Sequence, residues 1–407
     1  MAAAAAAVVF DAEVLSREER IPAQFVWSAQ ERAPADGVEE IAIPVVDLGG
    51  FLRRGDGELP GGVAEACERH GFFQVVNHGV RAALLADAYR CLDAFYARPL
   101  ADKQRAQRRP GESHGYASSF TGRFRCCLPW KETLSFNCPA AAAGNERTGA
   151  VVDYFVDVLG EDYRHMGYLQ SCQNPCIYSH SVRTCYKGAR IETHACREVY
   201  QGYCDEMARL ALDVTEVLAA ALGLRRGALR GVFAGGDSIM RLNHYPACRQ
   251  PHLTLGTGPH RDPTSLTLLH QDDVGGLQVR DGDGAWRAVR PRADAFVVNI
   301  GDTFAALTDG RHASCLHRAV VSGDRARRSL AFFLNPPLER VVRPPDALLL
   351  QLEKGRRPRA FPDFTWREFL EFTQKHYRSD ASTMDAFVSW IATGGRAGDG
   401  HGGQEGK

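Results

Sequence analysis

The sequence predicts an α+β protein built around a double-stranded β-helix, or jelly roll, that is flanked by helices. From Ser238 onward, short apolar segments alternate with turns rich in Gly, Asp and Pro, a pattern typical of jelly-roll strands. Elsewhere, apolar residues recur at three- and four-residue steps, and this period indicates amphipathic helices. Two such helices are expected near the carboxyl end, at residues 366–375 and 384–391.

The elements expected before the jelly roll follow the same two periods. In chain order they are a strand with a turn over residues 41–51, a helix over 63–70, a β-rich segment over 71–80, a helix over 85–95 and a helix over 203–221. Gly223 lies where the last of these helices should end. The basic run at residues 102–109 is expected to form a solvated helix face.

The composition excludes several classes of partner. The chain has 407 residues, with 49 Lys and Arg against 49 Asp and Glu, and this balance predicts no nucleic-acid partner. No apolar run approaches the roughly 20 residues of a membrane span, and the first residues lack the basic region of a targeting signal. We therefore expect a cytoplasmic monomer whose 12 cysteines stay reduced.

Composition also divides the chain into segments. In order, these are a mostly disordered segment over 1–40, an N-terminal helical and β region over 41–165, an atypical insertion over 168–196, a helix with the jelly roll and C-terminal helices over 197–393, and a disordered tail over 394–407. Within the first segment, IPAQFVW (residues 21–27) is the exception, because its apolar residues could pack on the core.

The insertion at residues 168–196 has neither a helical nor a strand period. Its Cys172 and Cys176 have a spacing found in structural zinc sites. The alternative is a surface insertion whose thiols are incidental, and its polar, turn-rich composition favours this interpretation. We expect a disordered segment that binds no zinc and contributes nothing to an active site.

A metal site is predicted by GPHRDP and CLHR. Residues i and i+2 of a strand point to the same side, so His260 and Asp262 should project together. With the distant His317 they would form a facial triad of two histidines and one carboxylate, which suits Fe(II) and leaves coordination positions open. His270 and His312 are rivals for the distal position, but the first reads as a strand-end residue and the second lies in a turn-like segment.

A carboxylate anchor follows the metal motif. In RARRSLAFFL, Arg327 and Ser329 share one face of an expected strand. An arginine fork binds a carboxylate through two parallel hydrogen bonds, and the serine hydroxyl can bind the same group. A metal triad followed by such an anchor predicts a 2-oxoglutarate-dependent oxygenase.

Longer motifs carry a resemblance to a known family. IPVVDLG, ACERHGFFQVVNHGV, NHYPACRQP, VVNIGDTFAALTDGRHASCLHRAVV and RRSLAFFL resemble the plant 2-oxoglutarate- and Fe(II)-dependent dioxygenases, which belong to the isopenicillin-N-synthase-like superfamily. IPAQFVW and LPWKETLSF resemble the gibberellin 20-oxidases within it. The resemblance extends from about residue 21 to 391, the insertion excepted.

The resemblance implies roles for particular residues. His260, Asp262 and His317 would hold iron, and Arg327 and Ser329 would hold the distal carboxylate of oxoglutarate. Two further residues of the NHYP motif, Tyr245 and Asn243, would contact or organise the end of oxoglutarate that chelates iron. Two residues of LPWKET, Lys131 and Trp130, would bind substrate. The family more often has tyrosine where this chain has His244.

The resemblance also implies the reaction. Carbon-20 of a gibberellin precursor, a diterpenoid carboxylic acid, would be oxidised in successive steps and removed with Fe(II), oxoglutarate and O2, and with ascorbate as reductant. Two alternatives are considered. One is another plant oxygenase of this type, such as a gibberellin 3- or 2-oxidase or a flavonoid hydroxylase. The other is a jelly-roll binding protein with a vestigial metal site.

Overall fold

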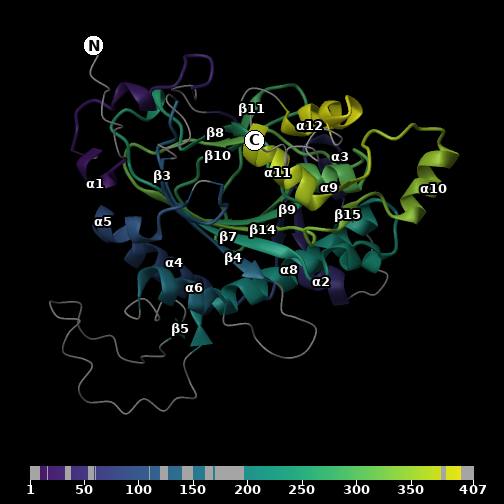
Figure 1. The fold of residues 1–407 in the computed structure, drawn as a ribbon, viewed down its shortest axis with the longest axis horizontal. Helices are drawn as coiled ribbons and strands as arrows, with labels where there is room; N and C mark the ends of the chain where they lie inside the picture. Colours follow the sequence, from purple (N-terminus) through teal and green to yellow (C-terminus); the bar gives the residue numbers. More distant parts are fainter. Residues whose placement is uncertain are drawn as a thin grey trace, which may run out of the picture.

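Two β-sheets face each other at the centre of the molecule, and helices surround them (Figure 1). In this computed structural model, the described residues are 10–15, 17–32, 38–53, 59, 61–109, 111–119, 127–139, 150–160, 168–169, 197–376 and 382–395. The two facing sheets, with helices at their margins, confirm the α+β class and the jelly-roll core.

The large sheet has eight strands in the order β1-β2-β12-β9-β14-β7-β4-β3. Their bounds are β1 Val45–Asp47, β2 Phe72–Val76, β12 Phe296–Ile300, β9 Leu266–Gln271, β14 Arg327–Leu334, β7 Asp237–Tyr245, β4 Glu132–Pro139 and β3 Gly115–Ser118. All neighbouring strands except β1 and β2 are antiparallel. An antiparallel sheet that faces a second sheet is typical of a jelly roll.

The small sheet has four strands in the order β11-β10-β13-β8. Their bounds are β11 Trp286–Ala288, β10 Leu277–Arg280, β13 His317–Ala319 and β8 Thr257–His260. An apolar cluster that includes Phe72, Leu277 and Val297 joins the facing sides of the two sheets. The space between the sheets is therefore closed at that end by packed side chains.

Strands from the first half of the chain lie at both edges of the large sheet, and strands from the second half lie between them. The early strand β2 pairs with β12, and β4 pairs with β7 over eight residue pairs. The main apolar cluster likewise includes residues from Val46 to Phe387. The segments 41–165 and 197–393 therefore build one shared core.

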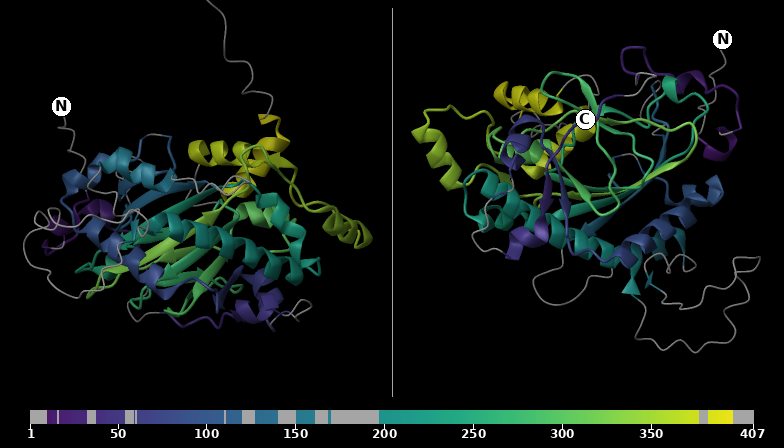
Figure 2. Two further views of the ribbon diagram at one scale, coloured as in Figure 1. Left: turned by 90° about the horizontal axis from the view of Figure 1, so that it is seen from below. Right: turned by 180° about the vertical axis from the view of Figure 1, so that it is seen from behind.

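Helices cover the outer face of the large sheet, the face turned away from the small sheet (Figure 2). The long helix α8 (Val199–Ala221) packs against α4 (Ala82–Tyr96) and against β9 and β14. Their apolar stripes meet outward-facing strand residues such as Leu330 in the main cluster. Gly223 follows α8 with a φ of 67°, the left-handed conformation that ends helices and that glycine adopts without strain.

The remaining elements are short and lie around this framework. They are α1 Ala12–Leu15, η1 Ala23–Phe25, α2 Leu48–Arg53, α3 Val63–Arg69, α5 Leu100–Lys103, η2 Gln104–Ala106, α6 Ala150–Leu159, η5 Arg226–Phe233, η6 Pro251–Leu253, α9 Asp302–Leu307, β15 Val341–Val342, α10 Asp346–Lys354, β16 Phe364–Thr365, α11 Trp366–His376 and α12 Thr383–Ala392. The helices expected at 63–70, 366–375 and 384–391 are confirmed. No helix in the described ranges has both the length and the apolarity needed to cross a bilayer.

Two expectations for the first 110 residues differ from the structure. Within the segment 1–40, Phe25 of IPAQFVW is buried against Trp130 as expected, but Phe10, which lies outside that motif, is fully buried there as well. The burial of these large rings offsets the cost of ordering this part of the chain. The basic run at 102–109 is solvated only in part: Arg105 and Arg109 are exposed, but Lys103 is buried and bonded to Glu132.

The ends of the insertion lie side by side. Strand β5 (Tyr168–Leu169) pairs with β6 (Arg197–Glu198), which runs directly into α8. Residues 170–196, including the cysteines considered for zinc, lie outside the described residues, as do residues 396–407 of the tail.

Candidate metal centre and active site

His260, Asp262 and His317 converge between the two sheets. His260 ends β8, Asp262 follows in the adjoining loop, and His317 begins β13 directly opposite His260. Asp262 Oδ1 lies 3.5 Å from His260 Nε2 and 3.8 Å from His317 Nε2. The three possible ligand atoms, one from each residue, all lie within 4.8 Å of one another. No other cluster of metal-ligating side chains occurs among the residues that the structure describes.

Neighbouring groups orient all three side chains. His260 Nδ1 lies 2.9 Å from the Gly258 carbonyl, and His317 Nδ1 lies 3.2 Å from the Cys315 carbonyl. Both rings therefore carry the proton on Nδ1 and turn Nε2 toward the centre, an arrangement common for metal-binding histidines. The second carboxylate oxygen of Asp262, Oδ2, accepts hydrogen bonds from Thr267 Oγ1 at 2.6 Å and Asn299 Nδ2 at 2.7 Å.

The protonation states also suit a divalent cation. Burial raises the pKa of Asp262, but His317, His260 and the Thr267 hydroxyl outweigh burial, and the pKa lies well below its usual range. Burial lowers the pKa of His317 to about 4, and the nearby His260 adds to this effect. At neutral pH, Asp262 is ionised and His317 is neutral, the forms in which these groups bind metals.

The two rival histidines face elsewhere. His270 lies on the outer face of β9, where its Nδ1 is 2.9 Å from the Tyr89 hydroxyl of α4. His312 is buried with its Nε2 at 3.1 Å from the Leu218 carbonyl of α8. Each therefore has a structural partner on the helical side of the sheet.

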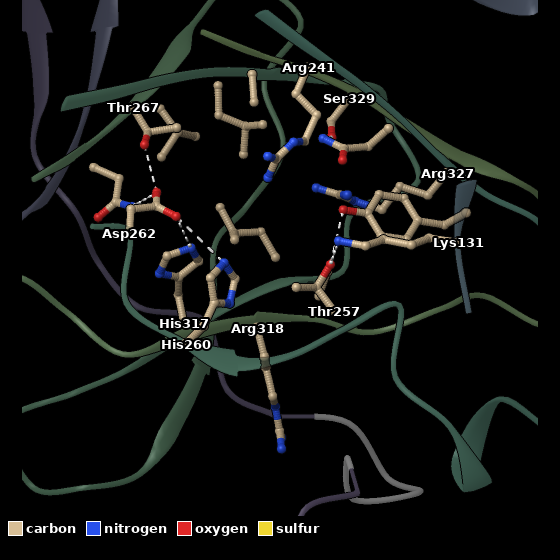
Figure 3. A pocket seen from close by; sticks show the side chains of 18 of the residues that line it. Lys131, Arg241, Thr257, His260, Asp262, Thr267, His317, Arg318, Arg327 and Ser329 are labelled. Atoms are coloured by element: carbon tan, nitrogen blue, oxygen red, sulfur yellow. Dashed lines mark hydrogen bonds and ion pairs between the residues drawn. The ribbon is translucent and has the colours of Figure 1, made fainter. Parts of the chain in front are cut away.

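Arg327 and Ser329 lie on the inner face of β14, as their spacing predicts (Figure 3). Their cross-strand neighbours are Tyr245 and Asn243 of β7. Asn243 Nδ2 donates to Ser329 Oγ at 3.2 Å, and the Arg327 guanidinium carbon lies 5.0 Å from the centre of the Tyr245 ring. The strand pairing thus brings together all four residues that the resemblance assigns to oxoglutarate.

The Arg327 guanidinium has incomplete hydrogen bonding. Its Nη2 donates to Gln271 Oε1 at 2.8 Å, but the buried Nε has no partner within the protein. A buried donor without a partner costs about 1–3 kcal/mol. A carboxylate bound at Arg327 and Ser329 removes this cost, so the residues fit the distal end of oxoglutarate.

Both groups of residues line one cavity of about 600 Å³, including its open mouth. Lys131 also lines the cavity, and its Nζ donates to Thr257 Oγ1 at 2.9 Å. Trp130 does not line it: its indole is 1 % exposed, packs against Phe10 and Phe25, and donates to the Pro246 carbonyl.

Several residues of the site were not identified from the sequence. Arg241 lines the cavity two residues before Asn243, on the same face of β7. The two-residue strand period that predicts Arg327 and Ser329 could also have identified Arg241, because Arg241 and Asn243 have the same spacing. Thr267 and Asn299 are single polar residues within the apolar strands LTLL and FVVNI, and such residues require buried partners.

The sequence has close relatives along nearly its whole length. The 2OG-Fe(II) oxygenase superfamily matches residues 236–336, and the N-terminal family described as non-haem dioxygenase in morphine synthesis matches residues 43–151. Gibberellin 20 oxidase 3 of Oryza sativa subsp. japonica is 70% identical over 95% of this chain and 96% of its own length. Gibberellin 20 oxidase 1-B of Triticum aestivum is 55% identical over 94% and 95%.

Solved structures agree with this relationship. JOX2, crystallised in complex with 2OG, Fe and JA, matches 94% of this chain and 98% of its own with a TM-score of 0.71 and 26% identity. The rice dioxygenase for auxin oxidation matches 82% of this chain and 95% of its own with a TM-score of 0.58 and 26% identity. The chain belongs to the gibberellin 20 oxidase family of 2OG-Fe(II) oxygenases.

Proposed function

We propose that this enzyme oxidises carbon-20 of gibberellin precursors in successive steps and removes it, as a 2-oxoglutarate- and Fe(II)-dependent dioxygenase of gibberellin biosynthesis. The observation that carries the proposal is that His260, Asp262 and His317, which could hold a metal ion, line one cavity with Arg327 and Ser329. Relatives with 70% and 55% identity over nearly the full chain support the choice of substrate.

Iron(II) would be held by His260, Asp262 and His317, the donor set that suits this metal and leaves positions open. Oxoglutarate would be held at its distal carboxylate by Arg327 and Ser329, with Tyr245 and Asn243 supporting this end of the cavity. Together with O2, and with ascorbate as reductant, these groups supply the oxidation of an unactivated carbon.

The chain itself contributes orientation and exclusion of water. Thr267 and Asn299 fix the Asp262 carboxylate, and backbone carbonyls fix the two imidazole rings. The apolar wall includes Leu269, Leu277, Val297 and Phe333, which suits a rigid hydrocarbon skeleton. No side chain needs to act as an acid or base in removing hydrogen from carbon, because bound iron and oxoglutarate would supply that chemistry.

Lys131 would contact the substrate, whereas Trp130 would act indirectly by packing beside Lys131.

We further propose a cytoplasmic monomer. Six cysteines in the described ranges are free thiols, which suits a reducing compartment; they are Cys67, Cys91, Cys138, Cys204, Cys248 and Cys315. A monomer is supported by the small number of exposed large apolar residues in the described ranges, which are Val14, Val45, Val341 and Leu350. Light scattering of the purified protein will test the oligomeric state.

One assay separates this function from its alternatives. The purified protein is incubated with Fe(II), oxoglutarate, ascorbate and gibberellin precursors, and the products are identified by mass spectrometry. Loss of carbon-20 supports the proposal. Hydroxylated products that keep every carbon would indicate a gibberellin 3- or 2-oxidase, and turnover of flavonoids alone would indicate a flavonoid hydroxylase. A failure to consume oxoglutarate with any of these compounds would favour a binding protein.

A further inference from the structure

Gln271 and Asp272, at the end of β9, meet two consecutive arginines at the start of β14. Gln271 lies opposite Ser329 and shares its inner face, where Gln271 Oε1 accepts a hydrogen bond from Arg327 Nη2 at 2.8 Å. On the outer face, Asp272 Oδ2 accepts from the Arg328 backbone N–H at 2.7 Å and from Arg328 Nε at 3.3 Å. The outer arginine therefore bonds to a carboxylate, whereas the inner arginine bonds to a neutral amide.

The contact between Gln271 and Arg327 is buried, since each residue is 2% exposed. A guanidinium has only donors, so the amide turns its oxygen toward Arg327. The amide nitrogen of Gln271, Nε2, is then buried without a hydrogen-bond partner among the described residues. Because the rest of the amide is unpaired, its contact with Arg327 is the polar interaction that holds this side chain in place.

Arg327 is held from two sides. Gln271 binds its Nη2, and the centre of the Tyr245 ring lies 5.0 Å from its guanidinium carbon. Arg327 Nε keeps no hydrogen-bond partner among the described residues. A guanidinium fixed in this way loses less conformational entropy on binding a carboxylate than a mobile one does, and it still has a donor to offer.

A neutral acceptor at position 271 leaves the charge of Arg327 uncompensated from this side. A glutamate there would pair with the guanidinium through charge-assisted hydrogen bonds, which are roughly twice as strong as neutral ones. It would also place a negative charge beside the distal carboxylate of oxoglutarate, and like charges repel strongly where little water screens them. Within the described lining of the cavity, the one carboxylate is Asp262, which lies across the cavity from Arg327 (Figure 3).

We propose that Gln271 is a positioning residue for oxoglutarate. It fixes the Arg327 fork by accepting one hydrogen bond and, because it is neutral, leaves the positive charge of Arg327 to the distal carboxylate. This inference rests on the proposed function, in which Arg327 binds that carboxylate, and deepens it by naming the residue that makes the anchor selective for a cosubstrate with a second carboxylate.

The test compares oxoglutarate with 2-oxopentanoate, which keeps the chelating 2-oxo acid but has a methyl group in place of the distal carboxylate. Both affinities are measured by calorimetry on the Fe(II)-loaded protein in the absence of O2. Gln271→Glu should weaken oxoglutarate binding on the order of tenfold or more, about 1.4 kcal/mol. Gln271→Met, which keeps the length but loses the acceptor, should weaken it roughly threefold. Neither variant should change the affinity for 2-oxopentanoate.

Gln278→Glu provides the matched control. Gln278 is also buried, and its Oε1 also accepts a hydrogen bond from an arginine at 2.8 Å, but that arginine is Arg318, which points away from the centre of the cavity (Figure 3). This variant should leave both affinities unchanged. Melting temperatures will show whether each variant is folded, and Gln271→Met carries the test if Gln271→Glu is not.

Two results would overturn the inference: unchanged oxoglutarate affinity in the folded Gln271 variants, or an equal loss for both oxo acids, which would indicate a general disturbance of the site. Arg327→Lys separates this inference from the proposed function. Weaker oxoglutarate binding by Arg327→Lys but not by the Gln271 variants would keep the anchor and refute the positioning role. Unchanged binding by Arg327→Lys would instead refute the anchor on which the proposed function depends.

Discussion

The two faces of the large sheet each carry a buried polar cluster, and the two clusters differ in how well their hydrogen bonds are satisfied. The outer cluster comprises Glu132, Lys103, Tyr116 and His244. The inner cluster comprises the cavity residues Arg327, Gln271, Asn243, Ser329, Asn299, Thr267 and Asp262. The same strands, β4, β7 and their neighbours, supply both clusters because side chains alternate between faces.

The outer cluster is complete within the protein. Glu132 Oε1 accepts from Lys103 Nζ at 2.6 Å and from the Tyr116 hydroxyl at 2.5 Å, and Glu132 Oε2 lies 3.3 Å from His244 Nδ1. His244 also stacks on Tyr96, with ring centres 5.0 Å apart. Although the family more often has tyrosine at this position, the histidine has partners here and joins β7 to β4.

The inner cluster is incomplete. Arg327 Nε, Gln271 Nε2 and Asn299 Oδ1 are buried without partners in the protein. Because buried polar groups are nearly always paired in folded proteins, unpaired atoms gathered in one cavity indicate a place for ligands. Of these two clusters, the one whose hydrogen bonds are satisfied supports the fold, and the one with unpaired atoms lines the candidate site.

The largest expected effect lies at the metal end of the inner cluster. We predict that His260→Ala, Asp262→Ala and His317→Ala each abolish oxoglutarate turnover and leave the fold largely intact, because all three ligands are needed to hold the metal. His270→Ala and His312→Ala should keep measurable turnover. Oxoglutarate consumption and melting temperature are the two measurements. Normal turnover by His317→Ala, together with an inactive but folded His312→Ala, would identify His312 as the distal ligand instead.

In the outer cluster, we expect a change in stability rather than in chemistry. Glu132→Gln leaves the buried Lys103 ammonium without its counterion, and breaking a buried pair in this way costs about 3–5 kcal/mol. The free energy of unfolding in urea measures this loss. Glu339→Gln is the control, because Glu339 is 71% exposed in its pair with Arg367 and should cost at most about 1 kcal/mol. Equal losses from the two variants would contradict the contrast between buried and exposed pairs.

Acid should weaken the same outer cluster. Burial raises the pKa of Glu132, but hydrogen bonds from His244 and Lys103, the Lys103 charge and the Tyr116 hydroxyl hold it below its ordinary value. A carboxyl with a depressed pKa stabilises the fold fully above its unfolded pKa of about 4.3 and loses this contribution as the pH falls through the folded value. We expect unfolding free energies measured from pH 6 downward to fall less steeply in Glu132→Gln than in wild type. Parallel curves would rule out this assignment.

Two neighbouring arginines of β14, Arg327 and Arg328, lie on opposite faces of the large sheet and should differ in their effect on oxoglutarate binding. Arg327→Lys keeps the charge but loses the fork, so the KM for oxoglutarate should rise roughly tenfold or more, about 1.4 kcal/mol. Arg328 lies on the outer face, where it bonds to Asp272 and Asp93. Arg328→Lys should therefore change this KM far less. Similar increases from both substitutions would refute the strand register.

The smallest effect is expected from the insertion. Deleting residues 170–196 and joining β5 to β6 through a short turn should preserve or improve soluble yield and leave oxoglutarate turnover unchanged. The cost of closing a loop grows by only about 0.6 kcal/mol per doubling of its length, so its removal changes stability little. Stoichiometric zinc in the full-length protein, lost when Cys172 and Cys176 are replaced by Ser, would instead identify a metal module.

Local periodicity determined much of this protein from the sequence alone. The step of two residues placed Arg327 with Ser329 and separated both from Arg328, as the contacts of β14 confirm. The three- and four-residue steps predicted the helix that became α8. These signals need only neighbours in the chain, because side-chain direction in a strand or helix repeats with a fixed local period.

Only the tertiary structure decided which distant residues meet. The sequence favoured His317 over His270, but the reason lies in the pairing of distant strands: β13 pairs with β8 and places His317 beside Asp262, whereas the register of β9 turns His270 toward α4. Strand pairing likewise brought Arg241 into the cavity and Glu132 to the buried Lys103. Side chains far apart in sequence come together through the packing of whole elements, and no local period carries that information.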